Sequence, residues 1–459
     1  MNTYSKLCDA ADWFRPEIER IIVKELEETP RFHRKQWEFA MIFHVLRSLG
    51  KLGEDNVGLS MGGGKERVAY ALARHVRQLV VTDLYESETS WDCARTDNPD
   101  AFIRRNKPFP VDDARLMALR MDMRDLHFPD RTFDFCYSTC AVEHIGKESD
   151  FLAHFNEVAR VLKDDGVYVF TTEVLFGDTT VRDEHNYVFS LSLLFELFAQ
   201  SNLVPEEVFN AHVAPHAVNA PLPSTLPQLT SFAADNIAQR FLQNAQHIQL
   251  IRGKHPFTCG IFVLRKRTAE RSYTPARIEG LEETRAFAAR GVKEYVTMLA
   301  SSHVSLNPFG LLPGEHSRFY LDHAEFFKLP DRQGDNETAF HTDYIWFGTC
   351  RRVFDIALRV ESSERTGKPT LEMCVHRFKT LDSGAVECTI ATSIPVPSVG
   401  WMMRRLEVDL HEDYCYAVLA KVRGGTCVFD RIEIRSVLAA PSAKHQTRVD
   451  RSSHTVIVA

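Results

Sequence analysis

The chain has 459 residues, of which 44% are hydrophobic and 25% charged, a composition typical of a soluble globular protein with a sizeable core. Its length predicts two or three domains. The formal net charge of −7 argues against nucleic acid as a main partner, because proteins that bind nucleic acids usually carry a basic face.

Neither a signal peptide nor a membrane segment is expected. The N-terminus carries acids early, and no apolar run approaches the roughly 18 to 20 residues that span a bilayer. The ten cysteines, from Cys8 to Cys427, include no C-x-x-C pair, which predicts reduced thiols and neither a disulfide framework nor a zinc site. We therefore expect a cytoplasmic protein without a bound metal.

Apolar residues recur at three- and four-residue spacing from about residue 14 to residue 52, so we expect residues 1–56 to form a helical cap. From residue 57 to residue 268, short apolar runs alternate with amphipathic helices. The runs typical of strands are residues 56–61, 78–84, 133–140, 166–174 and 257–267. This alternation predicts βαβ units and therefore an α/β domain with a mostly parallel sheet.

A proline-rich stretch interrupts this order, and we interpret residues 214–254 as an insertion that ends in a helical piece, 234–253. A linking segment with one more helix covers residues 269–306. Short alternating runs separated by turn residues then predict an antiparallel β-sandwich over residues 307–440, and residues 441–459 form a tail.

The stretch Val57–Leu72, VGLSMGGGKERVAYAL, suggests a loop built around a ligand. A phosphate loop, G-x-x-x-x-G-K-S/T, would need glycine at Leu59 and a hydroxyl at Glu66, so it is excluded. A dinucleotide fingerprint would need a third glycine where Arg67 stands. A ligand with a ribose and an adenine but no phosphate fits better.

Two acids support such a ligand. Asp83 ends the apolar run LVVTD, where it can accept hydrogen bonds from both ribose hydroxyls. Asp122 can accept the exocyclic amine of an adenine, with Met123 against the ring. The alternative for Asp83 is a helix N-cap, and for Asp122 a slip in register to Asp125.

The block Asp122–Ile145 resembles the class I S-adenosylmethionine-dependent methyltransferases, in their pattern D-x-x-x-L-x-F-x-D-x-x-F-D-x-x-x-S-x-x-x-x-E-H-I. Residues 157–173, EVARVLKDDGVYVFTTE, are similar to the family's R-x-L-K-P-G-G entry to the fifth strand. The resemblance covers roughly half of the chain. It implies a Rossmann-like fold with a seven-stranded, mostly parallel sheet, and S-adenosylmethionine as the cofactor.

The glycine loop departs from the family pattern, since the usual first acid aligns with Gly58 and the usual first glycine with Ser60. The resemblance still implies a set of cofactor-binding residues, namely Ser60, Gly62, Gly64, Asp83, Leu84, Asp122, Met123 and Ser138. A plain strand-to-helix turn is the alternative for the loop residues, and Ser138 and Thr139 either line the pocket or cap the next helix. Tyr85 and Trp91 pack either on the cofactor or in the core.

His144 is the first candidate for a catalytic base, because an imidazole with a pKa near 6.5 can take the proton that an acceptor oxygen or nitrogen loses. The alternative is that Glu143 and His144 only structure the turn. Glu173 is the second catalytic candidate, and His185 and Tyr187 follow it. Each of these three either binds the acceptor or has a structural role.

The C-terminal pattern resembles a jelly-roll carbohydrate-binding sandwich, in which Tyr344, Trp346 and Trp401 could stack on sugar rings. The combined hypothesis is an O-methyltransferase that acts on a sugar hydroxyl of a glycan. Two alternatives stay open: a non-catalytic binding protein with a degenerate methyltransferase domain, and a small-molecule or protein methyltransferase whose sandwich makes a homo-oligomer.

Overall fold

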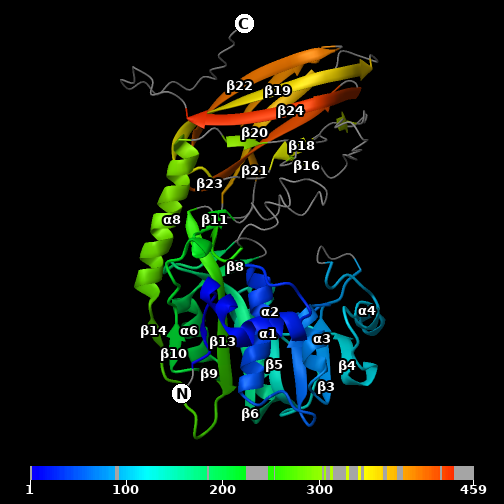
Figure 1. Cartoon of the computed structure of the whole chain (residues 1–459), viewed down its shortest axis with the longest axis vertical. Coiled ribbons are helices and arrows are strands. Elements are labelled where there is room, and N and C mark those ends of the chain that lie inside the picture. The colour runs from blue at the N-terminus through cyan, green and yellow to red at the C-terminus, as the bar shows by residue number, and fades with distance from the viewer. Residues whose placement is uncertain are drawn as a thin grey trace.

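The computed structural model describes residues 3–87, 92–182, 186–223, 247–252, 254–301, 304–306, 311–313, 327–329, 340–342, 346–364, 370–379, 386–397, 399–423 and 426–438. The C-terminal tail and most of the expected insertion lie outside these residues. Within them, the chain forms an α/β unit at the N-terminal end and two antiparallel sheets at the C-terminal end (Figure 1).

The α/β unit is built on a mixed sheet. Its main strands are β2 (Val57–Met61), β3 (Gln78–Asp83), β4 (Leu116–Arg120), β5 (Phe133–Thr139), β6 (Leu162–Leu175) and β13 (His255–Lys266). They lie in the order β13-β6-β5-β2-β3-β4. All these neighbours are parallel except β13, which runs antiparallel to β6. Each predicted strand run of this domain is thus confirmed as a strand.

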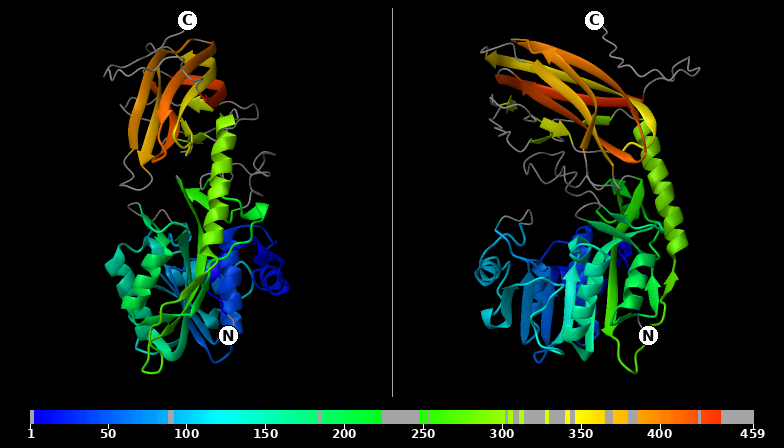
Figure 2. Two further views of the ribbon diagram at one scale, coloured as in Figure 1. Left: turned by 90° about the vertical axis from the view of Figure 1, so that its left-hand side faces the viewer. Right: turned by 180° about the vertical axis from the view of Figure 1, so that it is seen from behind.

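Helices cover both faces of this sheet because its strands are apolar on both sides. The helices of the first face are α2 (Arg34–Ser48), α3 (Arg67–Ala73) and α4 (Pro99–Arg105), and those of the second are α5 (Glu148–Val161) and α6 (Leu191–Gln200). Successive strand residues belong to opposite hydrophobic clusters: Val169 packs under the first face and Phe170 under the second. Figure 2 shows the sheet between the two layers.

The N-terminal segment is more than a helical cap. Its elements are β1 (Lys6–Leu7), the 3-10 helix η1 (Ala10–Phe14), α1 (Pro16–Arg20) and the π-helical turn η2 (Ile21–Glu25). The strand β1 pairs antiparallel with β13, so the start of the chain joins the sheet. The expectation of helix alone over residues 1–56 was therefore incomplete at β1.

Further short strands extend the sheet beyond the seven expected. They are β7 (Val181–Arg182), β8 (Tyr187–Ser190), β9 (Leu203–Pro205), β10 (Val208–Asn210), β11 (Leu222–Pro223), β12 (Leu250–Arg252) and β14 (Arg277–Glu279), and three 3-10 turns occur as η3 (Asp113–Arg115), η4 (Val142–His144) and η5 (Ala217–Asn219). The helix expected to continue to residue 253 is wrong at Leu250–Arg252, which pair with β13 as a strand.

Helix α8 (Leu281–Ser301) matches the expected linking helix and runs from the α/β unit to the C-terminal sheets (Figures 1 and 2). The first sheet contains β15 (Val304–Leu306), β17 (Phe327–Leu329), β19 (Cys350–Glu364), β22 (Gly400–Leu410) and β24 (Thr426–Leu438). The second contains β16 (Leu311–Pro313), β18 (Phe340–Thr342), β20 (Thr370–Lys379), β21 (Val386–Pro395) and β23 (Tyr414–Arg423).

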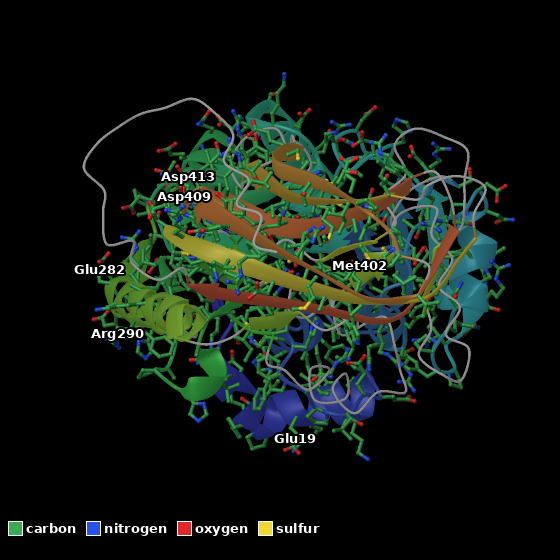
Figure 3. All side chains as sticks on the ribbon, turned by 90° about the horizontal axis from the view of Figure 1, so that it is seen from above. Glu19, Glu282, Arg290, Met402, Asp409 and Asp413 are labelled. Carbon is green, nitrogen blue, oxygen red and sulfur yellow. The ribbon has the colours of Figure 1, made fainter. Side chains whose placement is uncertain are left out.

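The two C-terminal sheets share one hydrophobic cluster. Residues of β19 and β22, such as Phe354 and Leu406, belong to the same cluster as Val375 of β20 and Val418 of β23. From above, β22, β19 and β24 form the outer layer (Figure 3). Among the described residues, no helix combines the length and the apolar character that a bilayer span requires.

The aromatic stack around Phe262 gives a test of the α/β core. The ring of Phe262, 1% exposed, stacks on Phe170 and Phe209 with centroids 5.2 and 4.8 Å apart. We expect Phe262→Ala to lower the free energy of unfolding by about 3–5 kcal/mol, because it leaves a cavity. Urea unfolding measures this. The control Phe14→Ala, at a side chain 71% exposed, should change it by less than about 0.5 kcal/mol.

Candidate active site

The glycine loop follows β2 and has a backbone that only glycine adopts easily. Gly62 and Gly64 have φ of 63° and 41°, in the left-handed region. A Cβ on Gly62 would lie 2.5 Å from the Cβ of Ala141, and one on Gly64 would lie 2.5 Å from the carbonyl oxygen of Cys93. The loop therefore brings bare backbone against the loop after β5.

The loop begins later in the sequence than the family alignment suggested. Ser60 lies inside β2 with its side chain buried, and its Oγ fills the space that a Cβ on Gly63 would need, at 2.1 Å. Gly58 has no room for an acid, because a Cβ there would lie 2.1 Å from the ring of Phe135 on the neighbouring strand. Lys65 lies over the ring of Phe102 on α4.

Asp83, at the end of β3, ties the glycine loop to its neighbouring strand. Its Oδ2 accepts from the backbone N–H of Gly64 at 3.0 Å, and its Oδ1 from that of Leu84 at 2.8 Å. Burial raises the pKa of Asp83, although these backbone N–H groups act in the opposite direction. Below the loop, the buried Tyr85 donates its hydroxyl to the carbonyl of Gly64 at 3.0 Å.

Asp122 follows β4 and its carboxylate already has a partner. Arg124 Nη2 donates to Asp122 Oδ2 at 2.6 Å, and the backbone N–H of Arg124 donates to Oδ1 at 2.9 Å. The Arg124 guanidinium lowers the pKa of Asp122. An adenine amine bound as predicted would therefore donate to a carboxylate that also accepts from Arg124.

The remaining predicted cofactor residues are Met123, Leu84 and Ser138. Met123 is buried, and its Cε lies 3.0 Å from the position of a Cβ on Gly62, so it borders the glycine loop. Leu84 lies directly after Asp83 and is 50% exposed. Ser138 is buried inside β5. The structure thus brings Gly62, Gly64, Asp83 and Met123 together.

His144 ends the short helix η4, next to the glycine loop's neighbour Ala141, and is exposed. The adjacent Glu143 is buried and accepts from Thr172 Oγ1 at 2.8 Å. Burial raises the pKa of Glu143, while His144 acts to lower it. Glu143 is therefore anchored to β6, and His144 is the side chain of the pair that faces outward.

Glu173, the second catalytic candidate, is held in a buried ion pair. Arg34 Nη2 of α2 lies 2.5 Å from its Oε1, and Asn186 Nδ2 donates to its Oε2 at 3.0 Å. Burial disfavours the charged carboxylate, but Arg34 and Asn186 outweigh it and lower the pKa of Glu173. A carboxylate bound in this way is a poor proton acceptor.

His185 and Tyr187 are the other two residues predicted to bind the acceptor. Tyr187 is 6% exposed and stacks on Phe189 with centroids 5.5 Å apart, so its ring packs in the core. His185 and Trp91 lie outside the described residues.

The sequence analysis missed a charged cluster that α2 brings to the carboxyl ends of β5 and β6. Lys35 Nζ lies 3.0 Å from Glu38 Oε2 and 3.6 Å from Glu66 Oε1, and it donates to the carbonyl of Thr139 at 3.3 Å. Thr139 Oγ1 in turn donates to Glu66 Oε2. The pKa of Glu66 is raised to about 7 by burial, against the opposing charge of Lys35.

The start of α2 is fixed locally by His33. Its ring Nδ1 accepts from the backbone N–H of Lys35 at 3.1 Å, as an N-cap does, and the ring stacks on His247 at 4.4 Å. Burial lowers the pKa of His33 to about 4, which keeps the ring neutral and able to accept.

Comparison with known proteins agrees with the geometry of this domain. Residues 59–170 match the family model described as a methyltransferase domain. No curated protein matches the sequence. Residues 59–170, which hold the glycine loop and Asp83, are thus similar to a methyltransferase domain.

Three solved structures are similar over part of the chain. A proposed sarcosine dimethylglycine methyltransferase from Galdieria sulphuraria is 17% identical, over 55% of this chain and 98% of its own, with a TM-score of 0.35. The YcgJ protein from Bacillus subtilis is 20% identical, over 49% and 99%, with a TM-score of 0.32. Geranyl diphosphate C-methyltransferase from Streptomyces coelicolor, solved with S-adenosyl-L-homocysteine, is 16% identical, over 58% and 89%, with a TM-score of 0.34.

The raised pKa of Glu66 predicts a pH-dependent stability. Between pH 4.5, the ordinary pKa of this side chain, and about pH 7, Glu66 keeps its proton in the folded chain but has released it in the unfolded chain. The free energy of unfolding should therefore fall as the pH rises through this window, by about 3 kcal/mol relative to Glu66→Gln. Urea unfolding at pH 4.5 and pH 8 measures this.

Glu86→Gln is the control for this prediction, since the Glu86 side chain is 52% exposed. It should keep the pH dependence of the unmodified protein. Equal pH dependence in the unmodified protein and in Glu66→Gln would contradict the prediction.

Proposed function

We propose that the domain at residues 57–268 binds S-adenosylmethionine and transfers its methyl group to an acceptor. The observation that carries the proposal is the bare, left-handed glycine loop fastened to Asp83 beside Met123. This arrangement lies at the carboxyl end of the parallel strands, where open α/β sheets bind their ligands. The match of residues 59–170 to a methyltransferase domain supports it.

The residues present fit this cofactor. Gly62 and Gly64, which have no side chain, let the loop backbone lie directly against Ala141 and Cys93, and Asp83 has a carboxylate at the loop where a ribose diol would need acceptors. The cofactor also carries an amino-acid end with one positive and one negative group. Lys35, whose Nζ lies 3.6 Å from Glu66 Oε1 beside the same loop, offers a positive charge for the negative group.

The bound cofactor supplies a methyl group on a positively charged sulfur. The chain then has to orient an acceptor and remove its proton. Glu173 is ion-paired with Arg34, so we assign the role of proton acceptor to His144, whose imidazole is exposed next to the loop after β5. Glu143, hydrogen-bonded to Thr172, holds that turn in place.

We further propose that the acceptor is a sugar hydroxyl of a glycan and that the C-terminal sheets form a sandwich that binds it. Trp401 of β22 supports this, because its side chain is 50% exposed and lies beside the exposed Met403. An exposed indole can stack on a sugar ring. Trp346 has a different role, since it is buried and its Nε1 donates to the carbonyl of Glu412 at 2.7 Å; Tyr344 lies outside the described residues.

The C-terminal sheets touch the methyltransferase domain near the carboxyl end of β6. Ile251 of β12 packs in one cluster with Trp346 and Cys415, and Lys254 Nζ lies 3.0 Å from Glu412 Oε1. The same end of β6 pairs with β13 at Leu175 and Phe257.

Cofactor binding is tested with S-adenosylhomocysteine in isothermal titration calorimetry. We expect Asp83→Ala to weaken binding about 10- to 100-fold, because hydrogen bonds to a charged group contribute about 1.5–3 kcal/mol each. Asp125→Ala, at a carboxylate 79% exposed, is the matched control and should bind as the unmodified protein does. Equal binding by both variants, or none by the unmodified protein, would refute the cofactor assignment.

Acceptor choice is tested by methyl transfer from the radiolabelled cofactor to a panel of oligosaccharides. We expect transfer to a sugar, and Trp401→Ala should raise the KM for that sugar about three- to tenfold with little change in kcat, because stacking is worth about 0.5–1.5 kcal/mol. Val399→Ala, at a residue also exposed (66%), is the control. Cofactor binding without transfer to any sugar would instead favour a binding protein or a different acceptor.

A further inference from the structure

Two adjacent strands of the second C-terminal sheet bring together a histidine and two cysteines. Cys374 and His376 lie on β20 and Cys388 on β21. The two Sγ atoms and a ring nitrogen of His376 all lie within 4.8 Å of one another. Cys374 is buried, His376 half-buried and Cys388 exposed, so the cluster opens to solvent on one side.

The strand register creates this cluster. Cys374 and His376 are two residues apart on β20 and therefore share a face. His376 pairs directly with Cys388, because an irregularity between Val375 and His376 shifts the register by one residue. Without that shift Cys388 would have turned to the opposite face. The spacing in sequence gives no C-x-x-C signal, since the ligands come from different strands.

The face that carries the cluster is turned away from the sandwich-like core. Leu371, Met373 and Val375 of β20 belong to the shared hydrophobic cluster, so Cys374 and His376 lie on the other side. Cys415 of β23 lies on that side too and packs against Ile251 of the methyltransferase domain. The cluster therefore occupies the face of this sheet that points toward the methyltransferase domain (Figure 1).

Thiolate sulfur and imidazole nitrogen are the preferred ligands of Zn²⁺ in proteins. Three protein ligands leave a fourth tetrahedral position for water or another ligand. We propose that Cys374, His376 and Cys388 bind one Zn²⁺ ion in this way. The two thiols each release a proton when the metal binds, and the ion cross-links the edge strand β21 to β20.

A second cluster of metal-ligating groups serves as a contrast. Cys140 and Cys259 have their Sγ atoms 3.4 Å apart, and Cys259 Sγ lies 3.2 Å from Glu38 Oε1. The ammonium group of Lys35 already neutralises Glu38 at 3.0 Å, and a metal cation there would face that charge. We therefore assign the metal to the β20–β21 cluster and not to this one.

The test is a titration of the full-length, reduced and metal-free protein with Co²⁺, whose thiolate charge-transfer absorption reports cysteine coordination, followed by measurement of the Zn²⁺ content. We expect one metal per chain in the unmodified protein. Loss of a residue that only hydrogen-bonds to a metal ligand lowers metal affinity about 10- to 100-fold. Cys388→Ser removes a ligand itself, so it should lower the Co²⁺ affinity by more than that. His376→Ala should do the same.

Cys140→Ser is the matched control and should keep both the stoichiometry and the absorption band. Cys388 is exposed, so its replacement by serine leaves the fold intact, and circular dichroism checks this. Loss of metal in Cys140→Ser, retention of full affinity in Cys388→Ser, or the absence of any thiolate band in the unmodified protein would each overturn the proposal.

Discussion

Arg34 and Lys35, two adjacent cations at the start of α2, neutralise the carboxylates buried at the carboxyl end of the central sheet. Arg34 pairs with Glu173 of β6, and Lys35 pairs with Glu38 and Glu66. A buried carboxylate without a partner costs several kcal/mol, so these pairs leave α2 little freedom in where it lies on the sheet. The position of α2 then determines one side of the space beside the glycine loop.

Two carboxylates in contact with Arg34 and Lys35, those of Glu173 and Glu66, have pKa values shifted in opposite directions. Glu173 is kept charged by Arg34 and Asn186, whereas burial raises the pKa of Glu66 to about 7. Glu173 was one of two catalytic candidates, and its ion pair with Arg34 favours the structural alternative. Glu66, which follows the glycine loop, has the higher pKa of the two acids.

The C-terminal sheets differ from the α/β domain in how they use their faces. One face of each sheet is buried in a shared cluster. The other face presents exposed Trp401 on the outer layer, and the cluster around His376 on the side toward the α/β unit. Since strand residues alternate between faces, a single run such as TLEMCVHRF contributes both core and surface groups.

Periodicity in the sequence was sufficient to place five of the six main strands of the α/β unit and the linking helix α8, because apolar spacing of two or about 3.6 residues is a local property. It did not predict β4, and it failed at Leu250–Arg252, where pairing with β13 outweighs a helical pattern. Gly62 and Gly64 have the left-handed backbone that a tight loop after β2 requires, and Gly58 is explained by contact with Phe135.

The sequence by itself therefore determined the α/β character of residues 57–268 and the positions of most of its main strands, but not β1 or β4. Only the tertiary structure decided which charges meet: Arg34 with Glu173, Lys35 with Glu66, and Arg124 with Asp122. It also decided that His376 lies beside Cys388. The physical reason is that burial, strand register and helix placement act between residues far apart in the chain, and local patterns carry no information about them.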